Sequence, residues 1–127
     1  MPETHPLAKQ DRVPLEALCG ELFLLLEKEE KAEISELFAR HGLTPHVKLR
    51  TVDDYAVMSM VESGLGLSIL PGLILRRIPY KIAIRPLTVP ASRTLGLALR
   101  KDVPTPLAVR RFLDYLPYLD EKPARLF

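Results

Sequence analysis

The stretch that most constrains how this chain folds is Val61–Pro71, which reads VESGLGLSILP. Gly64 has the place of a residue that ends a helix in the left-handed conformation, which glycine adopts at little cost. Gly66 permits a second sharp change of direction, and Leu67–Leu70 then fit a strand covered on both faces. Pro71 ends that strand because it cannot donate to the hydrogen-bond ladder. The stretch predicts a helix, a tight turn and a buried strand, and ligands of α/β proteins often lie beyond the carboxyl end of such a strand.

The residues before this turn predict strands and helices in alternation. After an extended lead-in, the pattern indicates a helical turn at Pro14–Cys19, a buried strand at Leu22–Leu26, a helix at Ile34–Gly42, a strand at His46–Thr51 and a helix from Thr51 to Ser63. Thr51 has the position of an N-cap, with Asp54 three residues on as in a capping box and Asp53 beside the positive helix end. The second helix is apolar around most of its circumference, which favours burial between layers or contact with a partner.

The residues after the turn predict shorter elements and a final helix. They comprise one or two helical turns at Gly72–Arg77, strands at Tyr80–Arg85 and Arg93–Arg100, and an amphipathic helix at Leu107–Leu116 with Val109, Phe112, Leu113 and Leu116 facing inward. The alternation along the whole chain predicts an α/β fold with helices layered around a largely parallel sheet.

Length and charge set broad limits. At 127 residues the chain has room for one domain with a substantial core, and its net charge of +2 is no nucleic-acid signature. The charge is unevenly distributed, because residues 1–75 hold 7 basic and 12 acidic side chains while residues 76–127 hold 11 and 4. Two solvated surfaces of opposite sign are the favoured interpretation, and attraction within the fold or between copies is the alternative.

The compartment is inferred from cysteine content and from the start of the chain. Cys19 is alone, so it forms no intramolecular disulfide, and we expect it to be a structural residue in a reducing compartment. The first residues do not follow a signal-peptide pattern, and no apolar run approaches the ~20 residues that span a bilayer. We therefore expect a soluble, cytoplasmic protein without membrane contact.

No residue pattern demands catalysis, a metal or a cofactor. The three histidines and Cys19 show no metal-ligand spacing, and Gly64-x-Gly66 lacks the third glycine of a dinucleotide-binding fingerprint. Asp53 and Asp54 could form an acid–base pair, but adjacent residues at a helix start point apart, so capping is favoured. The run Glu27–Glu33 is favoured as a solvated stretch over a ligand contact. We expect no catalytic residue, no metal site and no cofactor.

Several segments occur in a characteristic order and spacing. They are His5-Pro6-Leu7-Ala8 in the lead-in, the first buried strand, His41-Gly42-Leu43-Thr44-Pro45, the Val61–Pro71 turn and the helix around Phe112. Together, from about His5 to Leu116, they resemble the effector-binding region of LysR-type bacterial transcriptional regulators. The resemblance implies an α/β fold like the type 2 periplasmic binding proteins, a layered sheet with helices on both faces. Residues 1–90 would form a near-complete second subdomain, and residues 91–127 the return strand and C-terminal helix of a partial first one.

Two parts of the family's pattern have no counterpart in this sequence. They are the winged helix-turn-helix with its linker helix, and the opening βαβ portion of the first subdomain. The resemblance therefore implies that half of the effector cleft is missing, and that DNA would be bound only through a missing N-terminal domain.

The resemblance also assigns effector-binding residues to one wall of the cleft. They are Glu30 and Lys31 in the loop after the first strand, Thr51, Val52 and Asp53 at the strand-to-helix junction, and Leu97 on the return strand near the hinge. Free N–H groups at the helix start after Thr51 could accept an anionic effector group. Asp53 argues against a carboxylate there, because two anions repel each other. That Thr51 merely caps its helix is an equally weighted interpretation, and the two roles are compatible.

The leading hypothesis is a non-enzymatic sensor of a small-molecule effector, which works as the effector-binding and oligomerisation module of a LysR-type regulator. In this family such domains pair antiparallel, so we expect a homodimer or higher homo-oligomer. Effector binding would act by shifting the balance between two arrangements of the regulator. A solute-binding protein of a transport system is the alternative, and a small α/β enzyme using Asp53, Asp54 and a histidine is the third hypothesis.

Overall fold

The computed structural model describes residues 1–27, 33–92 and 97–116. The described residues fall into two compact units, with Met1–Ala91 in the first and the described residues from Ser92 to Leu116 in the second. The first unit holds two 3₁₀ helices, η1 (Pro6–Lys9) and η2 (Leu15–Gly20), the strands β1 (Leu22–Leu26) and β2 (His46–Thr51), and the helices α1 (Glu33–Arg40) and α2 (Asp54–Glu62). The second unit holds α3 (Leu107–Asp114). Each of the strands and helices predicted between Pro14 and Ser63 is present.

The two strands pair in parallel, as the alternation of strand and helix predicts. Leu22 lies opposite His46 and Leu26 opposite Thr51, with one irregularity in register between Phe23 and Leu24. A parallel pair needs a crossover connection, and α1 supplies it.

The predicted strand at Leu67–Leu70 is reduced to a single bridge on the other edge of β1. The Leu67 N–H donates to the Leu22 carbonyl and the Leu24 N–H to the Leu67 carbonyl, both over 2.8 Å, which pairs Phe23 with Leu67 in parallel. No further ladder follows, because the Ser68 hydroxyl, rather than a backbone N–H, donates to the Leu24 carbonyl at 2.7 Å. The segment therefore has the predicted place beside β1 without the predicted length.

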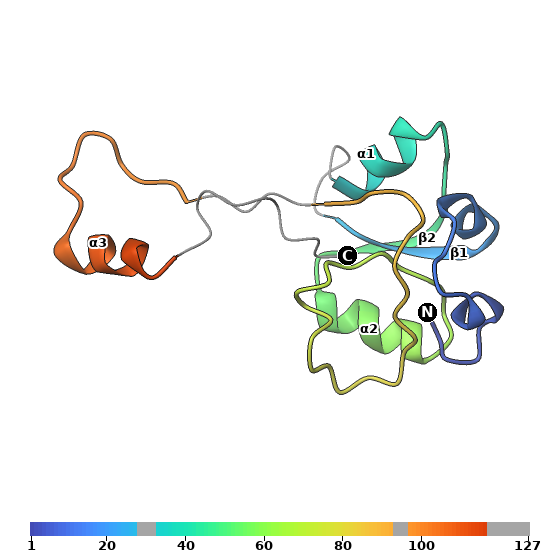
Figure 1. Cartoon of the computed structure of the whole chain (residues 1–127). Coiled ribbons are helices and arrows are strands. Elements are labelled where there is room, and N and C mark those ends of the chain that lie inside the picture. The colour runs from blue at the N-terminus through green and yellow to red at the C-terminus, as the bar shows by residue number, and fades with distance from the viewer. Residues whose placement is uncertain (28–32, 93–96, 117–127) are drawn as a thin grey trace. The chain divides into compact units, whose positions relative to one another are not determined.

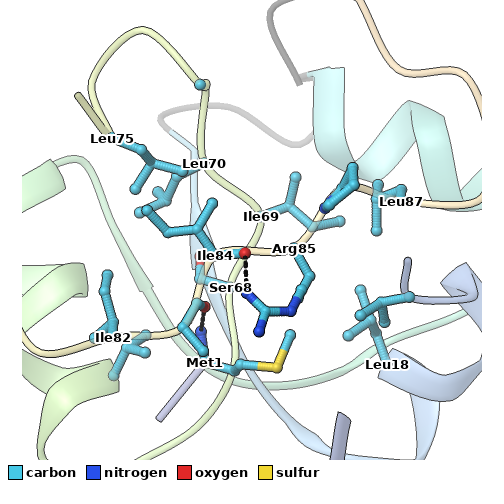
Figure 2. Close-up of a pocket in the computed structure, with 15 residues that line it drawn as sticks. Met1, Leu18, Ser68, Ile69, Leu70, Leu75, Ile82, Ile84, Arg85 and Leu87 are labelled. Carbon is cyan, nitrogen blue, oxygen red and sulfur yellow. Dashed lines mark hydrogen bonds between the residues drawn. The ribbon is translucent and has the colours of Figure 1, made fainter. Parts of the chain in front are cut away.

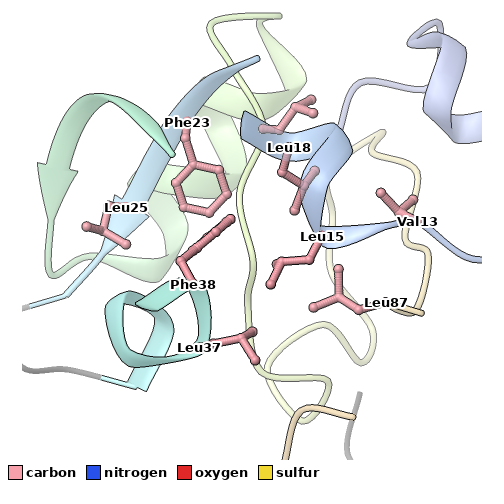
Figure 3. Packing of buried hydrophobic residues seen from close by; sticks show 9 residues of the cluster. Val13, Leu15, Leu18, Phe23, Leu25, Leu37, Phe38 and Leu87 are labelled. Atoms are coloured by element: carbon pink, nitrogen blue, oxygen red, sulfur yellow. The ribbon is translucent and has the colours of Figure 1, made fainter. Parts of the chain in front are cut away.

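Successive side chains of β1 point to opposite faces of the sheet, and a helix covers each face (Figure 1). On one face, Phe23 and Leu25 pack in a cluster with α1 and η2 (Figure 3). The rings of Phe23 and Phe38 meet edge to face, with centroids 5.4 Å apart. On the other face, Leu24 packs against α2, in a second cluster with Val57, Met58, Val61 and Leu70. The expectation of helices on both faces is confirmed.

The glycine turn has the predicted geometry at its first glycine and a different role at its second. Gly64 follows α2 with φ of +76°, the left-handed conformation expected of a residue that ends a helix. Gly66 is needed for close approach, since a Cβ there would lie 2.5 Å from the Leu22 carbonyl oxygen. The turn is thereby held against the backbone of β1.

The lead-in is not a free extended segment. Residues Pro6–Lys9 form η1, which His5 begins by accepting the Leu7 N–H on its Nδ1 at 3.2 Å. Isolated bridges pair Pro2 with Ile82 and Val13 with Leu87. The strand predicted at Tyr80–Arg85 is therefore an extended segment whose partner is the start of the chain.

Three other expectations are corrected or fall outside the described residues. Gly72–Arg77 is a series of turns rather than helix, with Arg77 at φ of +57°. The strand predicted at Arg93–Arg100 begins in residues that the structure does not describe, and residues 97–100 are not strand. The helix predicted from Leu107 is present as α3, but within its described unit none of its residues is buried, and Phe112 is 56% exposed.

Candidate functional site

One edge of the sheet combines the carboxyl ends of both strands with the start of α2. Because β1 and β2 are parallel, Leu26 and Thr51 end side by side, and the Glu27 N–H donates to the Thr51 carbonyl over 3.0 Å. Only Val52 and Asp53 separate the last residue of β2 from α2. The structure therefore brings Thr51, Val52 and Asp53 together at the edge where ligands of open α/β sheets commonly bind.

Asp53, and not Thr51, is the N-cap of α2. Its carboxylate oxygen Oδ1 accepts the N–H of Tyr55 at 2.9 Å and that of Ala56 at 3.1 Å. Thr51 still belongs to β2. Its hydroxyl oxygen accepts the N–H of Asp53 at 3.2 Å, before the helix begins. The predicted Thr51 cap was therefore wrong by two residues, because the chain stays in the sheet for longer than the N-cap pattern indicated.

The corrected cap changes what this helix start offers a ligand. The N–H groups of Tyr55 and Ala56, expected to be free for an anionic effector group, already donate to Asp53. The carboxylate compensates the positive end of the helix dipole. Within the described residues, Asp53 Oδ2 has no hydrogen-bond partner. An acceptor, rather than a cluster of donors, therefore faces the surrounding space.

Large apolar and aromatic side chains flank this acceptor on the surface. Val52 is 66% exposed and Tyr55 is 65% exposed, on either side of the exposed Asp53. Both side chains are accessible for apolar contact with a ligand whose hydrogen-bond donor reaches Asp53.

The structure does not test the other three predicted effector-binding residues. Glu30 and Lys31 lie outside the described residues. Leu97 is 51% exposed and belongs to the second unit, which is described by itself. The structure thus brings together three of the six predicted residues, those of the β2–α2 junction.

The sequence did not predict a pair of hydrogen bonds between Glu27 and Ser35, here called the Glu27 clasp, close to the same edge. Glu27, the first residue after β1, accepts the Ser35 N–H on Oε1 at 2.7 Å and the Ser35 hydroxyl on Oε2 at 2.6 Å. Its carboxylate therefore joins the end of β1 to the first turn of α1. Glu27 was interpreted as the start of a solvated acidic run; the only sequence signal for its role is a serine early in the helix that follows.

A pocket in the first unit was also not predicted. It has a volume of about 340 Å³ and lies between the Ser68–Leu70 segment and the extended residues 82–87. Its lining side chains follow the same apolar pattern as a core, so periodicity cannot distinguish them. Arg85, a charged residue within that apolar segment, is the one sequence signal that could have indicated it.

The described residues show neither a metal centre nor a membrane span. Within residues 1–27, 33–92 and 97–116, no three His, Cys, Asp or Glu side chains gather where a metal ion could be held. In the same residues, no helix combines the length and the apolar character needed to cross a bilayer.

Comparison with known proteins agrees with this architecture. The model of the LysR substrate binding domain family matches residues 1–119. The solved structure of HinK, a LysR family transcriptional regulator from Pseudomonas aeruginosa, superposes with a TM-score of 0.76 at 31% identity, over 91% of this chain and 41% of that one. The effector binding domain of QuiR in complex with shikimate superposes with a TM-score of 0.73 at 25% identity, over 90% of this chain and 56% of that one.

Curated relatives at the sequence level are transcriptional regulators. The activator CmpR of Synechocystis is 28% identical over 122 residues, which are 92% of this chain and 40% of that protein. The uncharacterized regulator YybE of Bacillus subtilis is 33% identical over 75 residues, which are 58% of this chain and 26% of that protein. The chain thus spans about a quarter to two fifths of the length of these relatives. Its α/β fold is that of the periplasmic-binding-protein-like effector domains, and the chain belongs to the LysR substrate binding domain family.

Proposed function

We propose that this chain is the effector-sensing part of a LysR-type transcriptional regulator, and that a small organic effector binds at the β2–α2 junction. The observation that carries this proposal is the meeting of two parallel strand ends with the start of α2, where Thr51, Val52 and Asp53 lie together. Family membership and the shikimate-bound QuiR domain support a small organic ligand for the domain. The role is binding rather than catalysis.

The chemistry of the junction selects which part of an effector it would hold. The unused oxygen of Asp53 accepts a hydroxyl or ammonium donor, while an effector carboxylate would be repelled from it. Val52 and Tyr55 offer apolar contact on either side. We expect an effector that presents a hydrogen-bond donor to this wall of the cleft. Glu30, Lys31 and Leu97 remain proposed effector contacts, on the ground of the family resemblance alone.

The remaining features of the regulator are proposals from the family. The chain would work as a homodimer or higher homo-oligomer, would reach DNA through a helix-turn-helix domain elsewhere in the regulator, and would act in the cytoplasm. Effector binding would change regulation only to the extent that it favours one arrangement of the assembly over another.

A ligand screen with matched variants tests the effector site. Shikimate and a panel of small hydroxy acids and amino acids are added to the ¹⁵N-labelled chain, and amide shifts are followed by NMR. Binding at the proposed site moves the signals of residues 51–56. Asp53→Ser keeps a good N-cap and removes the carboxylate, so it should weaken a binder that donates to Asp53 by roughly tenfold.

The control is Glu36→Gln, which removes one exposed carboxylate from α1 and should leave affinity unchanged. A binder whose shifts avoid residues 51–56, or whose affinity is equally insensitive to Asp53→Ser and Glu36→Gln, would contradict the assignment of the site.

A further inference from the structure

The pocket of about 340 Å³ is partly open to solvent and is lined mainly by apolar side chains, several of them from the two hydrophobic clusters (Figure 2). Leu18 and Leu87 come from the cluster around Phe23, and Leu70 comes from the cluster around α2. Ile82 and Leu75, which pack against the second cluster, lie on the opposite side of the pocket from Leu18. The space therefore lies between two packed regions of one unit.

Its size suits a small organic molecule. An apolar cavity of about 150 Å³ already accommodates benzene, and small-molecule sites begin at about 300 Å³. A pocket of this size with mostly apolar walls favours an apolar occupant, because the occupant and the walls remove apolar surface from water. One ring, or an alkyl chain of several carbons, would fill it.

The polar groups of the pocket favour a negative charge on that molecule. Arg85 is the one ionisable side chain among the lining residues, and no carboxylate is among them. Its guanidinium extends among the lining side chains and donates from Nη1 to the Ile84 carbonyl at 2.8 Å (Figure 2). Arg85 is exposed, so its other donors reach solvent, and within the described residues they have no partner in the protein. A planar guanidinium with unused donors matches a carboxylate.

The Met1 α-amino group is the other group at the pocket that can carry a positive charge. The Met1 α-amino group donates to the Ala83 carbonyl at 3.2 Å, and burial lowers the pKa of this group from 8.0 to about 6. At pH 7.5 it is mostly neutral in the folded chain, so Arg85 carries the persistent positive charge. A ligand anion would therefore depend on Arg85.

We propose that this pocket binds a small apolar monocarboxylate, with its ring or alkyl chain between Leu70, Ile82 and Leu18 and its carboxylate on the guanidinium of Arg85. This site is separate from the β2–α2 junction, which would hold the effector, and it goes beyond the function proposed for the chain. Because extended residues 82–87 form one wall of the pocket, occupancy would tie that segment more firmly to the core.

Two acids and their neutral analogues test the proposal. Benzoate, hexanoate, benzamide and hexanamide are titrated into the ¹⁵N-labelled 127-residue chain at pH 7.5, and amide shifts are mapped. The acids should move signals of residues 68–70 and 82–87, and should bind more tightly than the amides. Arg85→Gln should weaken acid binding roughly five- to tenfold, because it removes a charge-assisted hydrogen bond, and should leave the amides unchanged.

Arg76→Gln is the matched control, because Arg76 is an exposed arginine nearby in the chain that does not line the pocket. It should leave the affinity for all four probes unchanged. The proposal is overturned if pocket signals do not move, if acids and amides bind alike, or if both arginine variants weaken the acids equally. Acid-induced shifts confined to residues 51–56 would overturn it, and would also contradict the expectation that Asp53 repels a carboxylate. Pocket signals that move with protein concentration alone would overturn it by indicating a second copy as occupant.

Discussion

Gly66 has no side chain, and this lets the Val61–Pro71 turn lie against the backbone of β1. A Cβ at Gly66 would meet the Leu22 carbonyl oxygen at 2.5 Å and its carbonyl carbon at 3.2 Å. These are backbone atoms of the strand, and the same carbonyl accepts the hydrogen bond from Leu67. The Leu22 carbonyl cannot move away without breaking that hydrogen bond, so Gly66 cannot be replaced by a residue with a side chain.

Gly66→Ala should therefore lower the free energy of unfolding by about 2 kcal/mol or more, the cost of forced overpacking. Gly20→Ala is the control, because a Cβ at Gly20 would meet nothing within 4 Å. It should change stability by less than about 0.5 kcal/mol. Urea denaturation followed by circular dichroism measures both, and equal effects would contradict the close-approach role of Gly66.

Asp53 is the second residue on which local structure depends, since it accepts two backbone N–H groups at the start of α2. Asp53→Ala should cost about 1 kcal/mol in unfolding free energy, whereas Asp53→Ser should cost only a few tenths because serine is also a good N-cap. Thr51→Val, which leaves the carboxylate in place, should have a smaller effect than Asp53→Ala. The reverse order in urea denaturation would restore Thr51 as the cap.

Among elements, those with a strong local pattern were predicted, and those held by distant partners were not. β1, α1, β2 and α2 follow from apolar runs, helical spacing and a glycine at the helix end, all of which lie within a few residues. The pairing of Val13 with Leu87 leaves no such local signal, because neither segment forms a regular strand. At the candidate site, the sequence predicts the β2–α2 junction as an element boundary. The cap, the Glu27 clasp and the pocket were not predicted, because they depend on positions in space.

The Glu27–Ser35 clasp offers a test at this scale. Glu27→Ala and Ser35→Ala should each destabilise the chain by about 1 kcal/mol, and the double variant should cost about 1 kcal/mol less than their sum, because the two residues form one interaction. Chemical denaturation of the four proteins completes the cycle.

The control cycle pairs Glu27→Ala with Lys9→Ala, since Lys9 shares no hydrogen bond with the clasp. That pair should be additive within about 0.5 kcal/mol. Additivity of Glu27→Ala and Ser35→Ala would show that the clasp is not coupled in solution.

In the molecule as a whole, the described hydrophobic clusters draw all their members from the first unit. The buried residues run from Val13 to Leu87, and the partly buried residues around them end at Ala91. The family comparison extends further, to residue 119. Among the described residues, both hydrophobic clusters are therefore formed before the second unit begins.

A chain ending at Ala91 should fold by itself, with a single cooperative thermal transition within about 5 °C of the full chain, because it keeps both described clusters. Differential scanning calorimetry of the two proteins measures this. A chain ending at Tyr80 serves as the control; it loses Ile82 and Leu87 and should not show a cooperative transition. Loss of the transition in the longer truncation would mean that the second unit contributes to the core.

The links between the start of the chain and residues 82–88 bear on how the protein is made. Met1 and Ala83 exchange hydrogen bonds, and Arg12 donates to the Leu87 carbonyl from two guanidinium nitrogens. At about 5–20 residues per second, a ribosome needs roughly 4–16 s to add the intervening 80 or so residues. During that time the lead-in lacks these partners in residues 82–88. This part of the unit therefore cannot finish folding until residues 82–88 have left the ribosome.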